Sequence, residues 1–208
     1  MVLSLPWREA RDHPPFLLAL YLIMADVAIV IGHHPDAKGT ALRIGEKTIQ
    51  EYDLWRPFAE GLAASLEPEP AIVTRPNPDP DYELARRVNA TGAECAVELH
   101  FNAWKEPSVS GTEMLHHADS EAGQYLAHLL HDHTAEALGT KRRGLKARRT
   151  PGDSWPFLGM TEMPAVIAEP AFGSHRGDAW KLLTRQPQLL LAYKEAIEQW
   201  FSDTGGAW

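Results

Sequence analysis

Val27-Ala-Ile-Val-Ile31 is a run of apolar residues, and the turn-rich segment Gly32-His-His-Pro-Asp-Ala-Lys-Gly39 follows it directly. A short apolar run bounded by a glycine- and proline-containing loop is typical of a buried β-strand. Similar runs occur at 71–74, 95–100 and 165–169, with longer segments of helical periodicity between them. This alternation predicts one α/β domain with a mostly parallel, twisted sheet flanked by helices.

Four segments carry apolar residues at helical spacing, and we expect helices over 48–66, 82–93, 120–138 and 187 to about 202. Ser120 is a suitable N-cap for the third helix, and Gly139 is a suitable end for it. Pro187 suits the first turn of the last helix. A further strand is expected at 111–116, and the basic run 141–149 is expected to form a solvated loop.

Size and composition exclude several classes of protein. The 208 residues are 44% hydrophobic and 23% charged, which is ordinary for one globular domain. Such a chain makes a core without a structural metal, so any metal would be functional. The balance of 20 basic against 28 acidic residues gives a net charge of −8, which argues against a nucleic-acid partner. The single cysteine, Cys95, excludes an internal disulfide and a cysteine-based zinc finger.

Residues 1–23 are predicted to be an extension that precedes a domain over 24–208. The apolar run 15–24 follows Arg8 and Arg11 and is too short to span a bilayer, so we expect no transmembrane segment. Three interpretations of the extension remain open: a signal-like segment, an extra helix packed on the domain, or residues added by an early start codon.

Metal-competent side chains stand just past the predicted strands, where ligands gather in open α/β sheets. His33 follows the first strand, His100 closes the third, Glu169 closes the strand near the C-terminus, and Glu51 lies in the first turn of a helix. Two imidazoles with one carboxylate, a bound water and a second carboxylate acting as base are the parts of a catalytic zinc site. The sequence therefore predicts zinc-dependent hydrolysis.

Each of these residues also has a simpler interpretation. His33 alone is a hydrogen-bonded loop residue, and Glu51 alone is a solvated helix residue. Glu169 and His100 are harder to explain in this way, because apolar residues surround both in the sequence and buried carboxylates are rarely unpaired. His34 is expected to be exposed or to support a ligand from its outer side. Surface exposure is favoured for the other histidines outside the ligand set, namely His116, His117, His128, His131 and His133.

Two further segments bear on the chemistry. Ser174, in Gly173-Ser-His-Arg-Gly177, is one position too early for a Gly-x-Ser-x-Gly nucleophile elbow, so a serine hydrolase has no sequence support. The basic run 141–149 could receive the carboxylates of an anionic substrate if it lies beside a cleft. Trp104 and Trp155 are candidate groove residues because aromatic faces suit sugar rings, with core packing as the alternative.

Four motifs occur in this order: Ile31-Gly-His33, Leu99-His-Phe-Asn-Ala103, Ser110-Gly-Thr-Glu113 and Pro164-Ala-Val-Ile-Ala-Glu169. Together they resemble the zinc-dependent N-acetylmuramoyl-L-alanine amidases, which are cell-wall hydrolases with a single α/β catalytic domain. The resemblance extends from about Asp26 to about Ser202. It implies that His33, Glu51 and His100 bind one Zn²⁺ with a water in the open position.

The resemblance also implies that Glu169 is the catalytic carboxylate and that the substrate is peptidoglycan or a muropeptide, cleaved between N-acetylmuramic acid and L-alanine. We expect a monomer. Two alternatives remain: a zinc amidohydrolase of another small N-acyl amino acid or muropeptide, and an inactive domain that binds wall fragments. The sequence leaves open whether the protein is exported or periplasmic, or is a phage-type lysin that accumulates in the cytoplasm.

Overall fold

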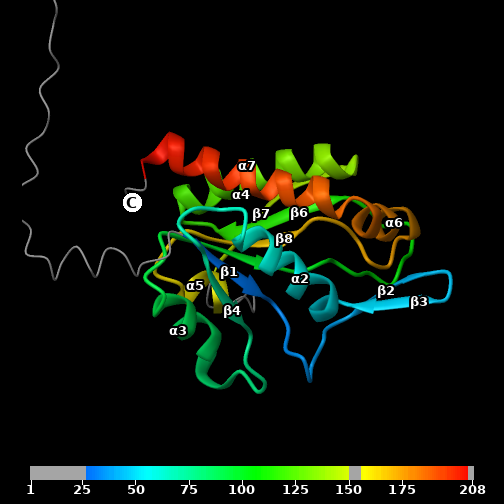
Figure 1. The fold of residues 1–208 in the computed structure, drawn as a ribbon, viewed down its shortest axis with the longest axis horizontal. Helices are drawn as coiled ribbons and strands as arrows, with labels where there is room; N and C mark the ends of the chain where they lie inside the picture. Colours follow the sequence, from blue (N-terminus) through cyan, green and yellow to red (C-terminus); the bar gives the residue numbers. More distant parts are fainter. Residues whose placement is uncertain (1–26, 150–155, 206–208) are drawn as a thin grey trace, which may run out of the picture.

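A computed structural model describes residues 27–149 and 156–205, which form an α/β domain around a six-stranded sheet of order β4-β1-β5-β8-β6-β7 (Figure 1). Adjacent strands are parallel except β6 and β8, which are antiparallel. The mostly parallel sheet is therefore confirmed. The strands are β1 Val27–Ile31, β2 Ala41–Ile44, β3 Lys47–Gln50, β4 Ala71–Thr74, β5 Cys95–Leu99, β6 Thr112–His117, β7 Arg142–Arg148 and β8 Ala165–Glu169.

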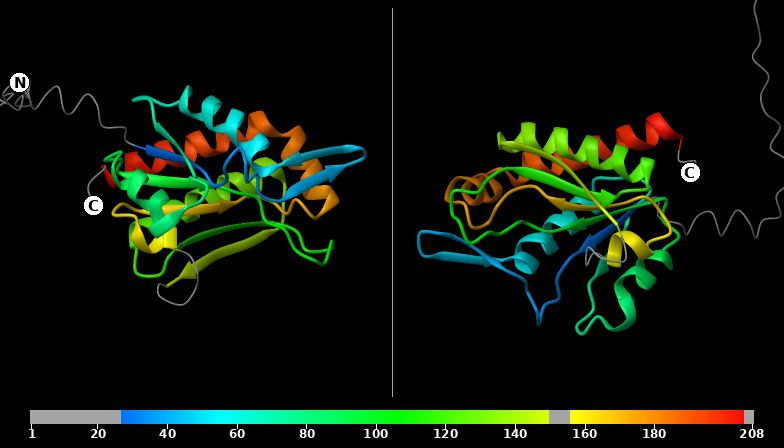
Figure 2. Two further views of the ribbon diagram at one scale, coloured as in Figure 1. Left: turned by 90° about the horizontal axis from the view of Figure 1, so that it is seen from below. Right: turned by 180° about the vertical axis from the view of Figure 1, so that it is seen from behind.

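Helices cover both faces of the sheet (Figures 1 and 2). Their bounds are α2 Glu51–Ala63, the short 3-10 helix η1 Pro80–Tyr82, α3 Glu83–Asn89, α4 Glu121–Leu138, α5 Pro156–Met160, α6 Arg176–Thr184 and α7 Gln186–Thr204. One apolar core joins α2, α4 and α7 to one face, with the large side chains of Trp55, Tyr193 and Trp200 fully buried. A second core joins α3 and α5 to the other face.

Two predicted ends of α4 are confirmed. Ser120 is the N-cap, and its Oγ accepts a hydrogen bond from Gly123 N at 3.0 Å. Gly139 takes a left-handed conformation at the other end, with φ 60°, which favours glycine. Among the described residues, no helix has both the length and the apolar character needed to cross a membrane.

The helix expected over 48–66 begins later than predicted. Residues up to Gln50 belong to the hairpin β2–β3, which projects from the domain in Figure 1, and α2 begins at Glu51. Gly45, with φ 58°, provides the hairpin turn, and the β-branched Thr48 and Ile49 suit an extended strand. A few apolar residues at mixed spacing were compatible with both structures.

The basic run 141–149, which was predicted to be a loop, forms the edge strand β7. An edge strand leaves side chains open to solvent, so charge does not prevent it from pairing. The helices α5 and α6 were not predicted. Residues 1–23, with the proposed boundary at Met24, and Trp155 lie outside the described residues.

The strand order sets the place of the site. The chain runs from β1 to β4 on one side of β1, and then crosses to β5 on the other side. The direction of the connections therefore reverses between β1 and β5. In open α/β sheets, ligands bind beyond the carboxyl ends of the strands at such a switch point. Because β6 is antiparallel to β8, the amino end of β6 lies at the same end of the sheet as the carboxyl end of β8. Glu113 pairs in register with Glu169 there.

Candidate metal centre

The structure brings His33, Glu51 and His100 together at the switch point. His33 Nε2 lies 3.2 Å from Glu51 Oε1, and His100 Nδ1 lies 3.2 Å from Glu51 Oε2. Each residue offers one ligand atom, and these atoms lie within 4.8 Å of one another. The three residues come from the loop after β1, the start of α2 and the segment after β5, and together they could hold a metal ion.

Backbone groups hold the Glu51 carboxylate in place. Thr40 N donates to Oε1 at 3.0 Å, and Phe101 N donates to Oε2 at 3.1 Å. Burial by itself raises the pKa of Glu51, but hydrogen bonds with His100 and His33 outweigh it and lower the pKa to about 2. The N-terminus of α2 also favours negative charge here. Glu51 is therefore an ionised carboxylate at neutral pH.

Two glycines leave room for the imidazoles. A Cβ on Gly32 would lie 2.0 Å from His100 Nε2, and a Cβ on Gly39 would lie 2.5 Å from His33 Nε2. Gly39 also has φ +78°, a conformation that favours glycine. The two rings pack edge to face, with centroids 4.9 Å apart. Any side chain at either glycine would push a candidate ligand out of the cluster.

His100 lies between two carboxylates. Its Nδ1 faces Glu51, and its Nε2 lies 3.2 Å from Oε1 of the fully buried Glu98. Burial alone lowers the pKa of His100, but the charge of Glu98 and the hydrogen bond with Glu51 raise it to about 10. In the metal-free protein, His100 is therefore protonated at neutral pH, and a metal cation would replace that positive charge.

Glu169 ends β8 beside this cluster. The adjacent residue, Ala168, accepts a hydrogen bond from His100 N at 3.1 Å, and Oε2 of Glu169 is buried without a hydrogen-bond partner in the described structure. Burial raises the pKa of Glu169 to about 8, against the opposing effect of His100 and with support from nearby carboxylates. A buried carboxyl with a raised pKa in such a position is suited to proton transfer.

A second polar group lines the same edge and was not assigned a role from the residues alone. Glu113 accepts hydrogen bonds from Asn102 Nδ2 and Arg143 Nε, each at 2.7 Å. The Arg143 guanidinium lies 4.9 Å from the centroid of the Phe172 ring. The signal that could have found Glu113 is a carboxylate in a strand whose burial is indicated by the adjacent Met114 and Leu115. Arg143 of the basic run thus contacts a carboxylate at the same end of the sheet as the candidate ligands.

Two of the histidines expected to be exposed are buried. His116 in β6 is 3% exposed, and burial lowers its pKa. His131 in α4 is 5% exposed; its Nδ1 lies 2.9 Å from Asp132 Oδ1, and its Nε2 accepts from Gly144 N. Both therefore serve packing, and the prediction of a solvated face was wrong for His131.

Trp104 is 57% exposed, and its backbone N donates to Ser174 Oγ. It lines a surface groove together with Thr40, Ala41, Ala103, Lys105 and Ser174. Thr40 also donates to Glu51, so this groove adjoins the metal-competent cluster. Trp104 is consequently open to solvent beside the candidate site, which rules out the core-packing alternative for this residue.

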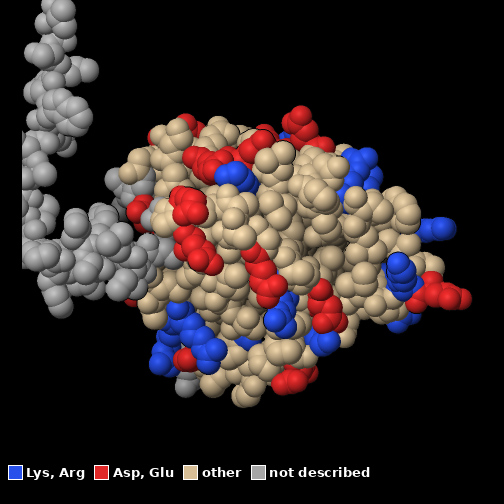
Figure 3. Space-filling view, viewed as in Figure 1, with Lys and Arg blue, Asp and Glu red and all other residues tan. Residues whose placement is uncertain are grey.

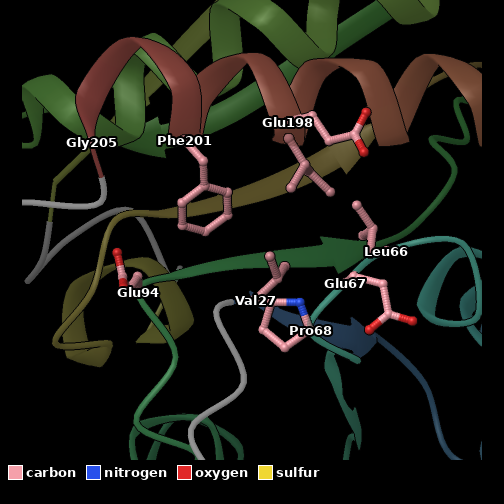
Figure 4. A pocket seen from close by; sticks show the side chains of 9 residues that line it. Val27, Leu66, Glu67, Pro68, Glu94, Glu198, Phe201 and Gly205 are labelled. Atoms are coloured by element: carbon pink, nitrogen blue, oxygen red, sulfur yellow. The ribbon is translucent and has the colours of Figure 1, made fainter. Parts of the chain in front are cut away.

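A different pocket lies at the other end of the sheet, where β1 begins (Figure 4). Its lining includes Val27 at the start of β1, Phe201 of α7 and the acidic side chains of Glu67, Glu94 and Glu198. It contains none of the candidate ligands.

On the face of the molecule drawn in Figure 3, acidic side chains are spread among separate basic ones.

The chain is similar to known proteins in its sequence family and in its fold. The family model described as N-acetylmuramoyl-L-alanine amidase matches residues 27–199. No curated protein is a significant sequence match to the chain.

Similar solved structures include an N-acetylmuramoyl-L-alanine amidase from Clostridium difficile 630, with a TM-score of 0.70 and 21% identity over 88% of this chain and 98% of that one. The catalytic domain of the amidase CwlV from Bacillus (Paenibacillus) polymyxa var. colistinus has a TM-score of 0.70 and 20% identity over 86% and 99%. The catalytic domain of the CD27L endolysin, which targets Clostridia difficile, has a TM-score of 0.68 and 20% identity over 84% and 97%. At these identities, the likeness shows a shared fold.

Proposed function

The chain belongs to the N-acetylmuramoyl-L-alanine amidase family, and from this we propose that zinc held by His33, Glu51 and His100 serves its hydrolysis of cell-wall peptidoglycan, with Glu169 as the catalytic carboxylate. The bond cleaved in this family joins N-acetylmuramic acid to L-alanine. The observation that carries the metal proposal is the convergence of three ligand atoms within 4.8 Å beside a buried carboxyl.

The donor set suits zinc. Zinc accepts imidazole nitrogen and carboxylate oxygen, and catalytic zinc sites use three protein ligands with one open position. The ligand atoms are already gathered, and Gly32 and Gly39 leave space around both rings. When bound, zinc would act as a Lewis acid on the scissile carbonyl and lower the pKa of a water to about 7.

Glu169 performs the proton transfers in this proposal. In the metal-free protein its pKa is about 8, so the carboxyl is largely protonated at pH 7. A nearby cation favours the carboxylate form, which can take a proton from the attacking water. The same carboxyl then donates that proton to the departing alanine nitrogen. The products are a muramic acid carboxylate and a peptide with a new alanine amino terminus.

The cleavage test is product analysis by mass spectrometry. Purified peptidoglycan is incubated with the protein, with and without a chelator, and new alanine amino termini are scored against new reducing sugar ends. We expect alanine termini that vanish on chelation and return with added zinc. Cleavage that survives complete removal of metal would refute the zinc proposal, and cleavage only of small N-acyl amino acids would favour the alternative substrate class.

Two variants separate the proposed roles. His100→Ala should lose zinc and turnover together, because it removes a ligand. Glu169→Ala should keep zinc and lose turnover, because it removes only the proton carrier. A metal-replete, active variant of either residue would remove its assignment. An inactive wall-binding domain has no need of the buried Glu169 carboxyl, so loss of wall cleavage without loss of zinc also argues against that alternative.

We further propose that the protein acts as a monomer. All four proposed site residues lie in one chain, at the ends of β1, β5 and β8 and the start of α2. Light scattering of the purified protein tests this: an active species with the mass of one chain is expected, and activity confined to a larger species would contradict it.

A further inference from the structure

Glu98 occupies an unusual place for a carboxylate. It lies in β5, a strand with neighbours on both sides, and its side chain is fully buried. A buried ion pair usually adds no more stability than apolar residues of the same shape, since desolvation costs as much as the attraction gains. Stability alone therefore does not explain a glutamate at this position, and its contacts point to the metal centre.

The contacts of Glu98 join an arginine to His100. Arg75 Nη2 donates to Glu98 Oε1 at 2.6 Å, and the same oxygen lies 3.2 Å from His100 Nε2. The other ring nitrogen of His100, Nδ1, faces Glu51. Glu98 is not a member of the group of three ligand atoms that could hold an ion. Glu98 therefore contacts the candidate ligand His100 at the ring nitrogen that does not face Glu51.

We propose that Glu98, held by Arg75, is a positioning residue that accepts the Nε2–H of His100 and so leaves Nδ1 free for the metal. The proposal rests on the metal centre proposed above. Carboxylates that accept the second N–H of a metal-binding histidine fix the ring orientation and its tautomer, and they increase the basicity of the ligand nitrogen. Glu98 has the placement for this role.

Arg75 extends the same support to the loop that carries the other histidine. Its Nε donates to Gly32 O at 2.7 Å, directly before His33, and its Nη1 donates to Asp79 Oδ2 at 2.8 Å. One guanidinium thus fixes the backbone beside His33 and the carboxylate behind His100. The planar arrangement of its donors makes such simultaneous bonds possible.

This arrangement predicts different tautomers for the two histidines. His33 presents Nε2 to Glu51, whereas His100 presents Nδ1. In the zinc-loaded protein, the metal should therefore sit on Nε2 of His33 and on Nδ1 of His100. The difference follows from Glu98, because a proton on Nε2 of His100 leaves only Nδ1 as a donor of electrons to the metal.

The first experiment measures the zinc Kd by competition with a chromophoric chelator for the wild type, Glu98→Gln and Glu83→Gln. Glu98→Gln keeps the shape and removes the charge, and we expect zinc binding to weaken about 10- to 100-fold. Glu83→Gln is the control, because it is the same change at a glutamate of α3 whose ion pairs are with Arg86 and Arg87, away from the Arg75–Glu98 pair. It should keep the zinc Kd within about two-fold, even if the thermal stability falls.

The outcomes are separable. Weakening of at least ten-fold in Glu98→Gln, with Glu83→Gln near wild type, supports the positioning role. A smaller change in Glu98→Gln, or an equal change in both variants, overturns it, because the carboxylate would then act only through packing. A wild-type protein that binds no zinc refutes the metal centre itself, and the positioning role falls with it.

A second measurement needs no variant and covers the case in which Glu98→Gln does not fold. Long-range ¹H–¹⁵N NMR of zinc-loaded protein with ¹⁵N-labelled histidine reports which nitrogen of each ring carries a proton. We expect the zinc-dependent signals to come from one ring of each tautomer. Two zinc-bound rings that both carry the proton on Nδ1 would overturn the proposal.

Discussion

Gly32→Ala is the substitution whose effect follows most directly from the geometry of the site. The added Cβ would lie 2.0 Å from His100 Nε2 and 2.3 Å from Cε1. Packed heavy atoms approach to about 3.5 Å, so the ring must move by roughly 1.5 Å. Metal–ligand distances tolerate only about 0.2 Å. The substitution should therefore displace His100 as a ligand.

The expected magnitude is a zinc Kd at least about 100-fold weaker, because losing a ligand exceeds the 10- to 100-fold effect of disturbing its support. Overpacking of this buried position should also cost about 1–3 kcal/mol of unfolding free energy. Gly32 lies outside the left-handed region, so alanine causes no backbone strain there.

The assay is zinc competition together with amidase turnover and thermal unfolding of the metal-free protein. Gly61→Ala is the control, since Gly61 lies in α2 and its added Cβ would meet, beyond the backbone of its own helix, the flexible Cδ1 of Leu190 at 3.1 Å. This control should keep the wild-type zinc Kd. If the Gly32→Ala protein binds zinc within about three-fold of wild type and turns over normally, the space at Gly32 is not needed to keep His100 as a ligand.

Three further predictions concern Glu169, His100 and Ser120. Folding raises the pKa of Glu169 from 4.5 to about 8, so the metal-free wild type loses stability as the pH rises through that range, whereas Glu169→Gln does not. In denaturant titrations, the variant should match the wild type near pH 4 and exceed it by about 3 kcal/mol at pH 7; equal stability at both pH values would contradict this. Because the pKa of metal-free His100 is about 10, zinc must displace a proton from His100 when it binds. Calorimetry in buffers of different ionisation enthalpy should therefore detect proton release, and the zinc affinity should rise with pH up to about 10. Ser120→Ala removes the N-cap of α4 and should cost about 1 kcal/mol of unfolding free energy with unchanged zinc Kd, as chemical denaturation would show.

Much of the fold is visible in the sequence because the central strands are buried on both faces. The apolar runs 27–31 of β1 and 165–168 of β8 have the length and the β-branched residues that are typical of a buried strand. The ends of α4 are equally clear, since Ser120 and Gly139 act through local backbone chemistry. These features depend on neighbours in the sequence, which a single chain displays.

The hairpin β2–β3 and the edge strand β7 were harder to foresee. Both carry charged or mixed patterns, and neither is buried on both faces. Their strand character comes from pairing with a partner, which overrides the local pattern. The position of β7 beside β6 depends on the sheet order, and the residues of β7 alone do not indicate it.

Candidate site residues could be chosen from the sequence because the carboxyl ends of parallel strands meet at one end of an α/β sheet, which made His33, His100 and Glu169 natural candidates. The contacts that Arg75 and Glu98 make around these residues could not be predicted in this way. Arg75 and Glu98 are 23 residues apart and meet only because β4, β1 and β5 are neighbours in the sheet. Glu98 also lies within β5, between Val97 and Leu99, and the sequence alone does not show that it contacts His100.

Anomalous X-ray scattering from zinc-loaded crystals shows directly whether His33, Glu51 and His100 bind the metal. Data collected on both sides of the zinc absorption edge locate the ion without reference to activity. We expect a single strong peak in contact with His33 Nε2, the Glu51 carboxylate and His100 Nδ1, with Glu169 beside it as a non-ligand. Active crystals in which the zinc peak lies elsewhere, or in which the three residues contact no metal, would contradict this expectation.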